Sequence, residues 1–229
     1  MGIKYKVNEK FFYKWSPKMA YVLGYIYADG SIHESNRGSY LSISSIDEKT
    51  IKKIRSWLSS GHKIYKMKFA WQKRRNQYVL RIGDREIYNS LLHHGIFPNK
   101  SLTVIFPKVP KKYLNPFILG YFDGDGCIYL YRSPGKTQKL ILRKLSVIFT
   151  SGSKKFLEGL LKALRNNLQI KQTKVYISHR SFQLRFATAD SVKLFKFMYQ
   201  DSSRDLFLRR KYDIFQKYFM LKRPSGEVV

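Results

Sequence analysis

A repeat within the chain constrains its fold more than any other sequence feature. With a constant offset of 96 residues, Ala20–Ile32 aligns with Pro116–Ile128, and six of the thirteen positions are identical. Self-similarity at a fixed spacing is the signature of a duplicated structural unit. The sequence therefore predicts two similar halves within one body.

Each copy opens with residues that favour the start of a helix. Ser16-Pro17 and Asn115-Pro116 each place a good N-cap residue before a proline, which suits the first helical turn. Gly30 and Gly126 follow the two copies, and glycine is the usual residue just past a helix end. We therefore expect one short helix in each copy.

Small residues recur at matching positions of the two predicted helices. Gly24 and Ala28 are four residues apart, and so are Gly120 and Gly124. Residues at this spacing share a helix face, and a face without bulky side chains lets two backbones approach closely. We expect the two helices to pack on each other about a pseudo-twofold axis.

An aspartate stands in the last turn of each predicted helix, at Asp29 and Asp125. A carboxylate there faces the negative end of the helix dipole, which costs roughly 0.3 to 1 kcal/mol. Paired helices would bring the two acids together, and two carboxylates repel unless a cation lies between them. Hard oxygen ligands of this kind suit Mg²⁺, so we predict a magnesium site.

The remaining sequence of each half predicts the same order of elements. Alternating and helical hydrophobic periods indicate an αββαββα plan in an α+β fold. The expected elements are strand 40–45, helix 47–58, strands 63–70 and 77–82 and helix 84–94, then strand 139–150, helix 153–168, strands 173–178 and 181–187 and helix 190–199. Prolines and lysines between 107 and 113 suit a short, stiff connection, so we place an N-terminal repeat at 1–107 and a C-terminal repeat at 108–229.

The charge of the chain points to a polyanionic partner. It carries 44 Lys and Arg against 15 Asp and Glu, a formal net charge of +29. Its 44% of hydrophobic residues is too many for a disordered basic tail. The basic residues are spread along the chain rather than gathered in one amphipathic helix, which favours nucleic acid over an anionic membrane surface.

An antiparallel sheet with one face covered by helices leaves the other face for a ligand, and a two-stranded ribbon fits the major groove of DNA. Polar side chains on the open face are the expected DNA contacts. The candidates are Lys66, Lys68, Arg81, Arg143, Lys174, Gln183 and Arg185.

Several classes of protein are disfavoured. The longest apolar stretch is about ten residues, against the roughly 20 that a membrane-spanning helix needs. Cys127 is the only cysteine, so a disulfide framework and a thiolate zinc site are excluded. We expect an intracellular protein, of an organelle or a microbial cytoplasm.

The two repeated segments, Val22–Gly30 (VLGYIYADG) and Ile118–Gly126 (ILGYFDGDG), resemble the name-giving motif of the LAGLIDADG homing endonucleases. The resemblance covers nearly the whole chain, because single-chain members of the family carry two motifs at about this spacing. It implies a pseudo-twofold pair of αββαββα repeats, with the motif helices at the interface and two antiparallel sheets forming a saddle on DNA.

Site residues follow from the resemblance. The second acid of the motif is catalytic and binds metal in the family, which points to Asp29 and Asp125, with the main-chain carbonyls of Ala28 and Gly124 beside them. The first acid, not a metal ligand, is Asp123 in the second copy, and Tyr27 replaces it in the first.

A basic residue near the site is implied in each half. These are Lys100 in the first half and Lys211 in the second, with Arg209 or Arg210 as alternatives for the latter. A polar residue at the end of the first strand corresponds to Ser45 and Ser151, where the family commonly has Gln.

The resemblance implies a monomeric endonuclease that cuts a long asymmetric DNA duplex by Mg²⁺-assisted hydrolysis and leaves short 3′ overhangs. Two alternatives stay open from the sequence. One is a maturase that binds intron RNA on the same scaffold, and the other is a DNA-binding regulator without catalysis.

Overall fold

The computed structural model describes residues 5–68, 76–134, 140–170, 173–200 and 207–222, without the side chains of 134 and 140–143. The first half holds α1 (Pro17–Asp29), β1 (Gly30–Ser35), β2 (Gly38–Ser45), α2 (Glu48–Trp57), β3 (Ile64–Met67), β4 (Gln77–Gly83) and α3 (Arg85–His93). Two short 3₁₀ turns, η1 (Lys100–Leu102) and η2 (Lys111–Tyr113), lead to the second half. That half holds α4 (Leu114–Asp125), β5 (Gly126–Pro134), β6 (Leu140–Ser151), α5 (Lys154–Asn167), β7 (Val175–Ser178), β8 (Ser181–Phe186), α6 (Thr188–Tyr199) and α7 (Arg209–Lys222).

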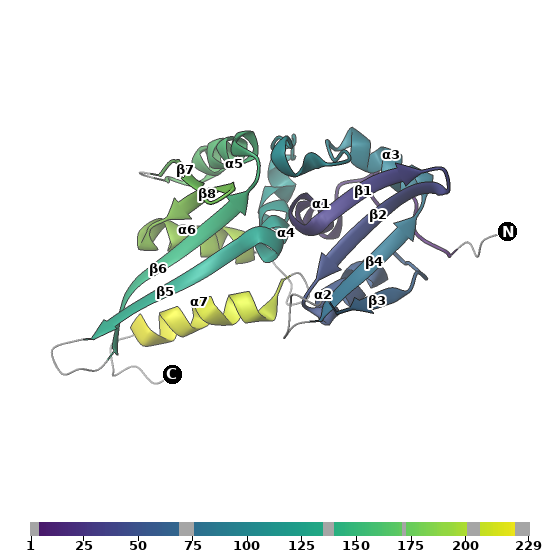
Figure 1. The fold of residues 1–229 in the computed structure, drawn as a ribbon. Helices are drawn as coiled ribbons and strands as arrows, with labels where there is room; N and C mark the ends of the chain where they lie inside the picture. The colour runs from purple at the N-terminus through teal and green to yellow at the C-terminus, as the bar shows by residue number, and fades with distance from the viewer. Residues whose placement is uncertain (1–4, 69–75, 135–139, 171–172, 201–206, 223–229) are drawn as a thin grey trace.

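The predicted αββαββα plan and the α+β class are confirmed in both halves. Each half forms a four-stranded antiparallel sheet, ordered β1-β2-β4-β3 in the first and β5-β6-β8-β7 in the second. The helices α1 and α4 lie side by side between the two sheets (Figure 1). The division at residue 107 stays a prediction.

Backbone contact between α1 and α4 explains the small residues of the repeat. A Cβ atom added to Gly24 would lie 2.0 Å from the carbonyl oxygen of Phe117. One added to Gly120 would lie 2.0 Å from the carbonyl oxygen of Tyr21. Because these distances are far below contact, only glycine allows this approach, and the expected helix pair is confirmed.

Strand register divides each sheet into a core face and an open face. Successive side chains of a strand point to opposite faces. On the core face of the first sheet lie the buried residues Ile32, Leu41, Ile43, Leu80 and Ile82. The matching face of the second sheet carries Leu145, Val147, Phe149, Leu184 and Phe186. Together with α1 and α4 these residues form one hydrophobic core.

The starts of the two motif helices differ. Ser16 caps α1 as expected, because its hydroxyl accepts a hydrogen bond from the N–H of Met19 at 3.1 Å. The expectation for Asn115 is wrong: α4 begins at Leu114, directly after η2, and Tyr113 occupies the N-cap position without a side-chain hydrogen bond. The preceding 3₁₀ turn supplies the helical geometry, so a capping side chain is not needed.

The glycines after the helices are present for a different reason than expected. Gly30 and Gly126 both have extended rather than left-handed backbones, with φ of −101° and −83°. A Cβ atom at Gly30 would lie 2.7 Å from the Cα of Ile26, and one at Gly126 would lie 2.5 Å from the carbonyl oxygen of Phe122. Lack of space, not a positive φ, requires glycine at both positions.

Three elements were not located in the sequence, although the αββαββα plan implies two of them. The strands β1 and β5 directly follow the motif helices, and α7 packs along β5 and β6 (Figure 1). Among the described residues, no helix combines the length and the apolar character that a membrane span requires.

Replacing Gly24 by Ala should destabilise the fold by about 2 to 3 kcal/mol, because the new methyl group overlaps the backbone of α4. Urea denaturation followed by circular dichroism measures this change. The control is Gly61→Ala, whose Cβ would lie 3.7 Å from the nearest atoms, an ordinary contact. Equal stability of the two variants would contradict the close approach.

Candidate active site

The two aspartates of the repeat meet where the paired helices end. Asp29 and Asp125 are the last residues of α1 and α4. The Asp29 carboxylate lies against the other helix, since its Oδ2 would be 3.3 Å from a Cβ added to Gly124. The helix pair therefore brings the carboxylate of one half to the end of the helix of the other.

Both carboxyl groups have raised pKa values. Desolvation by the surrounding protein is the largest cause at each residue. The negative charge of Asp29 raises the pKa of Asp125 further, to about 6. A buried acid whose ionisation is disfavoured by a neighbouring carboxylate forms part of a site that a cation would stabilise.

A buried lysine caps the carboxyl end of each motif helix. Lys100, on η1, is 5% exposed, and its Nζ donates to the carbonyl oxygen of Tyr27 at 3.1 Å. Lys211, on α7, is 4% exposed, and its Nζ donates to the carbonyl oxygens of Asp123 at 2.9 Å and Gly126 at 2.6 Å. Cations at the negative end of a helix dipole are stabilising.

Burial lowers the pKa of both lysines, that of Lys211 to about 8. The nearby carboxylates act against burial: Asp125 and Asp29 raise the pKa of Lys100, while Asp123 and Asp29 raise that of Lys211. The structure thus gathers all four predicted side chains, Asp29, Asp125, Lys100 and Lys211, into one electrostatic cluster. Of the alternatives at 209–211, Lys211 is the buried one, whereas Arg209 and Arg210 are exposed, although the charge of Arg210 also acts on Asp29.

The first acid of the motif has a separate environment. Asp123 is 1% exposed, and its Oδ2 accepts hydrogen bonds from the Tyr21 hydroxyl and the Leu208 N–H, both at 2.7 Å. Burial is the main reason that its pKa is raised to about 6. Its side chain fixes the start of α7, and hence the approach of Lys211.

In the first half, Tyr27 occupies the motif position of Asp123 and likewise anchors a neighbouring segment. Its hydroxyl donates to the carbonyl oxygen of His94 at 2.6 Å, at the end of α3, upstream of Lys100. Each motif therefore anchors the segment that precedes its lysine. The anchoring group is the Tyr27 phenol in the first half and the Asp123 carboxylate in the second.

The serines at the strand ends support the next helix. Ser45 and Ser151 are each 7% exposed, and their hydroxyls accept from the N–H groups of Asp47 and Ser153, both at 3.1 Å. They also hydrogen-bond to Tyr25 and Tyr121, respectively. These contacts explain why a small polar residue suits both positions.

The donor set fits Mg²⁺. Two carboxylates stand at the ends of adjacent helices, directly after the main-chain carbonyls of Ala28 and Gly124, of which the latter lies 3.5 Å from the Lys211 Nζ. Within the described ranges no cluster of three or more His, Cys, Asp and Glu side chains could hold a metal. A hard cation held through two carboxylates, carbonyl oxygens and waters is the arrangement that such a site accommodates.

The predicted DNA contacts divide by strand register. Arg81 pairs with Ser42 on the open face of the first sheet, and Gln183 and Arg185 lie on the open face of the second. Lys174 joins them, because its Nζ and the Arg185 guanidinium lie 5.6 and 5.9 Å from the ring centre of Tyr176.

The other three predicted DNA contacts are Lys66, Lys68 and Arg143. Lys66 pairs with Tyr78, which alternates with the buried Leu80 and Ile82, and it acts electrostatically on Glu48 of α2. Lys66 is nevertheless exposed at this sheet edge and is among the residues that line the depression described below, so its contact with DNA stays a prediction. Lys68 is exposed just beyond β3, and the side chain of Arg143 is outside the described residues.

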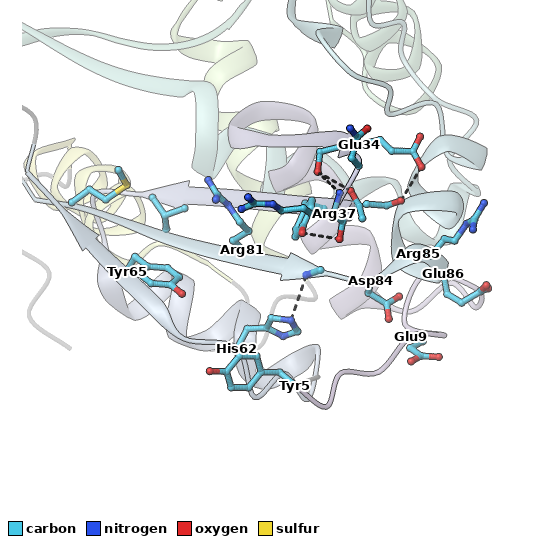
Figure 2. A pocket seen from close by; sticks show the side chains of 18 of the residues that line it. Tyr5, Glu9, Glu34, Arg37, His62, Tyr65, Arg81, Asp84, Arg85 and Glu86 are labelled. Atoms are coloured by element: carbon cyan, nitrogen blue, oxygen red, sulfur yellow. Dashed lines mark hydrogen bonds between the residues drawn. The ribbon is translucent and has the colours of Figure 1, made fainter. Parts of the chain in front are cut away.

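The open face of the first sheet is hollowed. A depression of about 1150 Å³ is lined by Tyr65, Arg81 and Arg37, with Asp84 and Glu86 at its other end (Figure 2). On the second sheet the open face exposes Tyr129, Tyr131 and Tyr176. These tyrosines were not among the predicted DNA contacts, although the alternation of residues along β5 indicates that Tyr129 and Tyr131 share one face.

Comparison with known proteins decides the family. Residues 16–95 and 112–197 each match the LAGLIDADG-like domain. The chain belongs to this family. The two matched segments contain the two motif helices and both sheets, so the LAGLIDADG resemblance of the repeats is confirmed.

Solved LAGLIDADG structures share the fold over most of their length. I-SmaMI bound to an uncleaved DNA target with calcium ions superposes with a TM-score of 0.63 at 11% identity, over 90% of each chain. I-WcaI bound to its DNA recognition sequence gives 0.59 at 13% identity, over 89% of this chain and 90% of that one. The meganuclease I-AabMI bound to uncleaved DNA gives 0.58 at 14% identity, over 90% of each chain.

A curated relative is the probable translation initiation factor IF-2 of Methanocaldococcus jannaschii, 26% identical over 188 residues. The match covers 77% of this chain but 14% of that protein. The chain thus corresponds to a small part of this relative.

Ionisation of Asp125 should destabilise the metal-free fold. Because its pKa is raised from 3.8 to about 6, the folded state retains a proton that the unfolded state loses between these pH values. Its contribution to the free energy of unfolding therefore falls as pH rises through this interval and levels off above it. Asn at 125 cannot ionise, so Asp125→Asn lacks this loss of stability. The free energy of unfolding of the variant minus that of the natural protein should therefore increase from pH 4 to about 6.5. Urea denaturation in the presence of EDTA measures this difference. A difference independent of pH would contradict the assignment.

Proposed function

We propose that the protein is a site-specific endonuclease that cuts both strands of a long, asymmetric DNA duplex with the help of Mg²⁺. The observation that carries this proposal is the cluster of Asp29, Asp125, Lys100 and Lys211 midway between two open sheet faces. The solved relatives I-WcaI and I-AabMI, which are bound to DNA, support the choice of substrate.

The acids and the lysines have different roles in the proposed reaction. Bound at Asp29 and Asp125, Mg²⁺ would supply Lewis acidity toward phosphate oxygens and a lowered pKa of a bound water. Lys100 and Lys211 are held by hydrogen bonds to helix carbonyls, so their positive charges are fixed near the acids, where they would stabilise the negative charge that builds up on the phosphate. Hydrolysis at two phosphates across the minor groove would leave short 3′ overhangs.

The sheets supply affinity and sequence recognition. Two four-stranded open faces flank the acid cluster. Equivalent positions carry the same side chain at Arg81 and Arg185, but different ones at Ser42 and Ile148 and at Val79 and Gln183. A single chain with unlike halves should act as a monomer on an asymmetric target. The net charge of +29 supports strong attraction to the phosphate backbone.

Asp29→Asn and Asp125→Asn should each reduce cleavage by at least about a hundredfold and leave DNA affinity within a few-fold, because a ligand and not a DNA contact is lost. The protein is incubated with Mg²⁺ and a randomised duplex library, and the cut ends are sequenced to find the target. The control is Glu158→Gln, an exposed carboxylate on α5 that should cut normally.

The alternatives give different results in the same assay. If the Asn variants cut at the natural rate, the site assignment is wrong. If the natural protein binds duplex DNA tightly without cutting any member of the library, the regulator is favoured. Tight binding to a structured intron RNA instead would favour the maturase.

Duplex binding should weaken steeply with salt, by a log–log slope of about −0.9 for each phosphate neutralised. Lys174→Ala should make this slope less negative by about 0.9 if Lys174 contacts a phosphate. Fluorescence anisotropy at several salt concentrations measures the slope. Lys162→Ala removes an exposed lysine from α5, on the helix-covered side, and should leave the slope unchanged. Equal slopes for Lys174→Ala and the natural protein would exclude that phosphate contact.

A further inference from the structure

An arginine on the open face of the first sheet has a fixed place relative to the acids. Ser31 lies two residues after Asp29 and pairs with Ser42 of β2, which pairs in turn with Arg81 of β4. Arg81 therefore stands in the second row of paired residues beyond the acid. Its side chain is exposed and lines the depression in this face (Figure 2).

The second sheet repeats this placement. Cys127 lies two residues after Asp125 and pairs with Ile148 of β6, which pairs in turn with Arg185 of β8. Arg185 is exposed as well, and its Nε donates to Oε1 of Gln183 at 2.9 Å, which orients the guanidinium. The two arginines thus occupy the same row of their sheets, at the same number of residue pairs from their own acid.

A tyrosine accompanies each arginine on the neighbouring edge strand. Tyr65 of β3 lies opposite the residue two before Arg81, and Tyr176 of β7 lies opposite the residue two before Arg185. Both tyrosines are exposed. The Arg185 guanidinium lies 5.9 Å from the ring centre of Tyr176, within the range of a cation–π contact. The two open faces therefore share an arginine and a tyrosine in the same relative places.

Neighbouring open-face positions have diverged between the halves. His33 of β1 corresponds to Tyr129 of β5, and Val79 of β4 corresponds to Gln183 of β8. The arginine and the tyrosine are thus retained among unlike neighbours. A task that is common to both half-sites of the DNA explains this better than general similarity of the two faces does.

The strand order favours base edges over phosphates as the partners of these arginines. The strands β4 and β8 lie inside their sheets, whereas β3 and β7 lie at an edge. When such a face enters the major groove, its edge strands approach the phosphates and its inner strands approach the base edges. A bidentate contact from arginine to O6 and N7 of guanine is the commonest specific contact in that groove.

We propose that Arg81 and Arg185 each read a guanine, at mirror-related positions of the two half-sites. The inference rests on the proposed endonuclease function and names a feature that an otherwise asymmetric target repeats. Because a pseudo-twofold axis relates the two halves, the guanines lie on opposite strands, at equal distances from the centre of the cut. Along one strand, the target therefore has guanine at one of these positions and cytosine at the other.

The randomised duplex library that identifies the target also tests this symmetry. Among the duplexes that the natural protein cuts, guanine should be enriched at least about tenfold over each other base at both mirror positions. Arg81→Ala should reduce this preference to less than about threefold in one half-site, and Arg185→Ala should do so in the other. Each variant should leave the preferences at the remaining positions unchanged.

The half-site that each variant leaves unchanged is an internal control, because a folding defect would weaken recognition of both. Lys162→Ala, on the helix-covered side, should alter no base preference. Fluorescence anisotropy in EDTA measures the same effect without cleavage. The affinity ratio between the target and a duplex with adenine in place of one guanine should fall toward one only for the variant of the arginine that reads that guanine.

Two results would overturn the inference and leave the endonuclease proposal intact. One is a selected target without guanines at mirror positions. The other is an equal loss of binding to all sequences by Arg81→Ala or Arg185→Ala with every base preference retained, which would make that arginine a phosphate contact. If the natural protein cut no duplex at all, the proposed function itself would fail, and this inference with it.

Discussion

The close approach of two helix backbones is the constraint on which the rest of the structure depends. At Gly24 and Gly120 the backbones of α1 and α4 contact each other without any side chain between them. The ends of both helices are thereby brought together, and with them Asp29 and Asp125. Because β1 and β5 start directly after these helices, the same contact also positions the two sheets on either side of the acids.

Placing two carboxylates at the negative ends of two helices is unfavourable, and the structure offsets much of this cost. Lys100 and Lys211 come from segments about 70 and 85 residues away along the chain and hydrogen-bond to the last carbonyls of α1 and α4. They neutralise both the helix ends and the acids. The raised pKa of Asp125 shows that the balance is incomplete, as is common where a site is organised for a ligand rather than for stability.

The two halves share a backbone plan but only part of their surface. Tyr27 and Asp123 occupy one motif position and hold different partners, a carbonyl in one half and an N–H in the other. The second half carries its lysine on α7, a helix of 14 residues, whereas Lys100 lies on the three-residue turn η1. Duplication gives the molecule its symmetry, which extends to Lys100 and Lys211 beside the acids and to Arg81 and Arg185 on the open faces, while other positions differ between the halves.

The sequence by itself determined the duplicated plan, the helix pair and the two aspartates, because these depend on local spacing and on a repeat visible within the chain. The family resemblance added the lysines at 100 and 211. Only the tertiary structure decided that Lys66 pairs with Tyr78 at a sheet edge, that α4 starts without a cap from Asn115, and that Lys211 rather than Arg209 or Arg210 is buried against α4. The physical reason is that strand phase, crowding at a glycine and the direction of a long side chain are set by residues distant in sequence. A local pattern can show that a side chain is available, but packing determines which groups it meets.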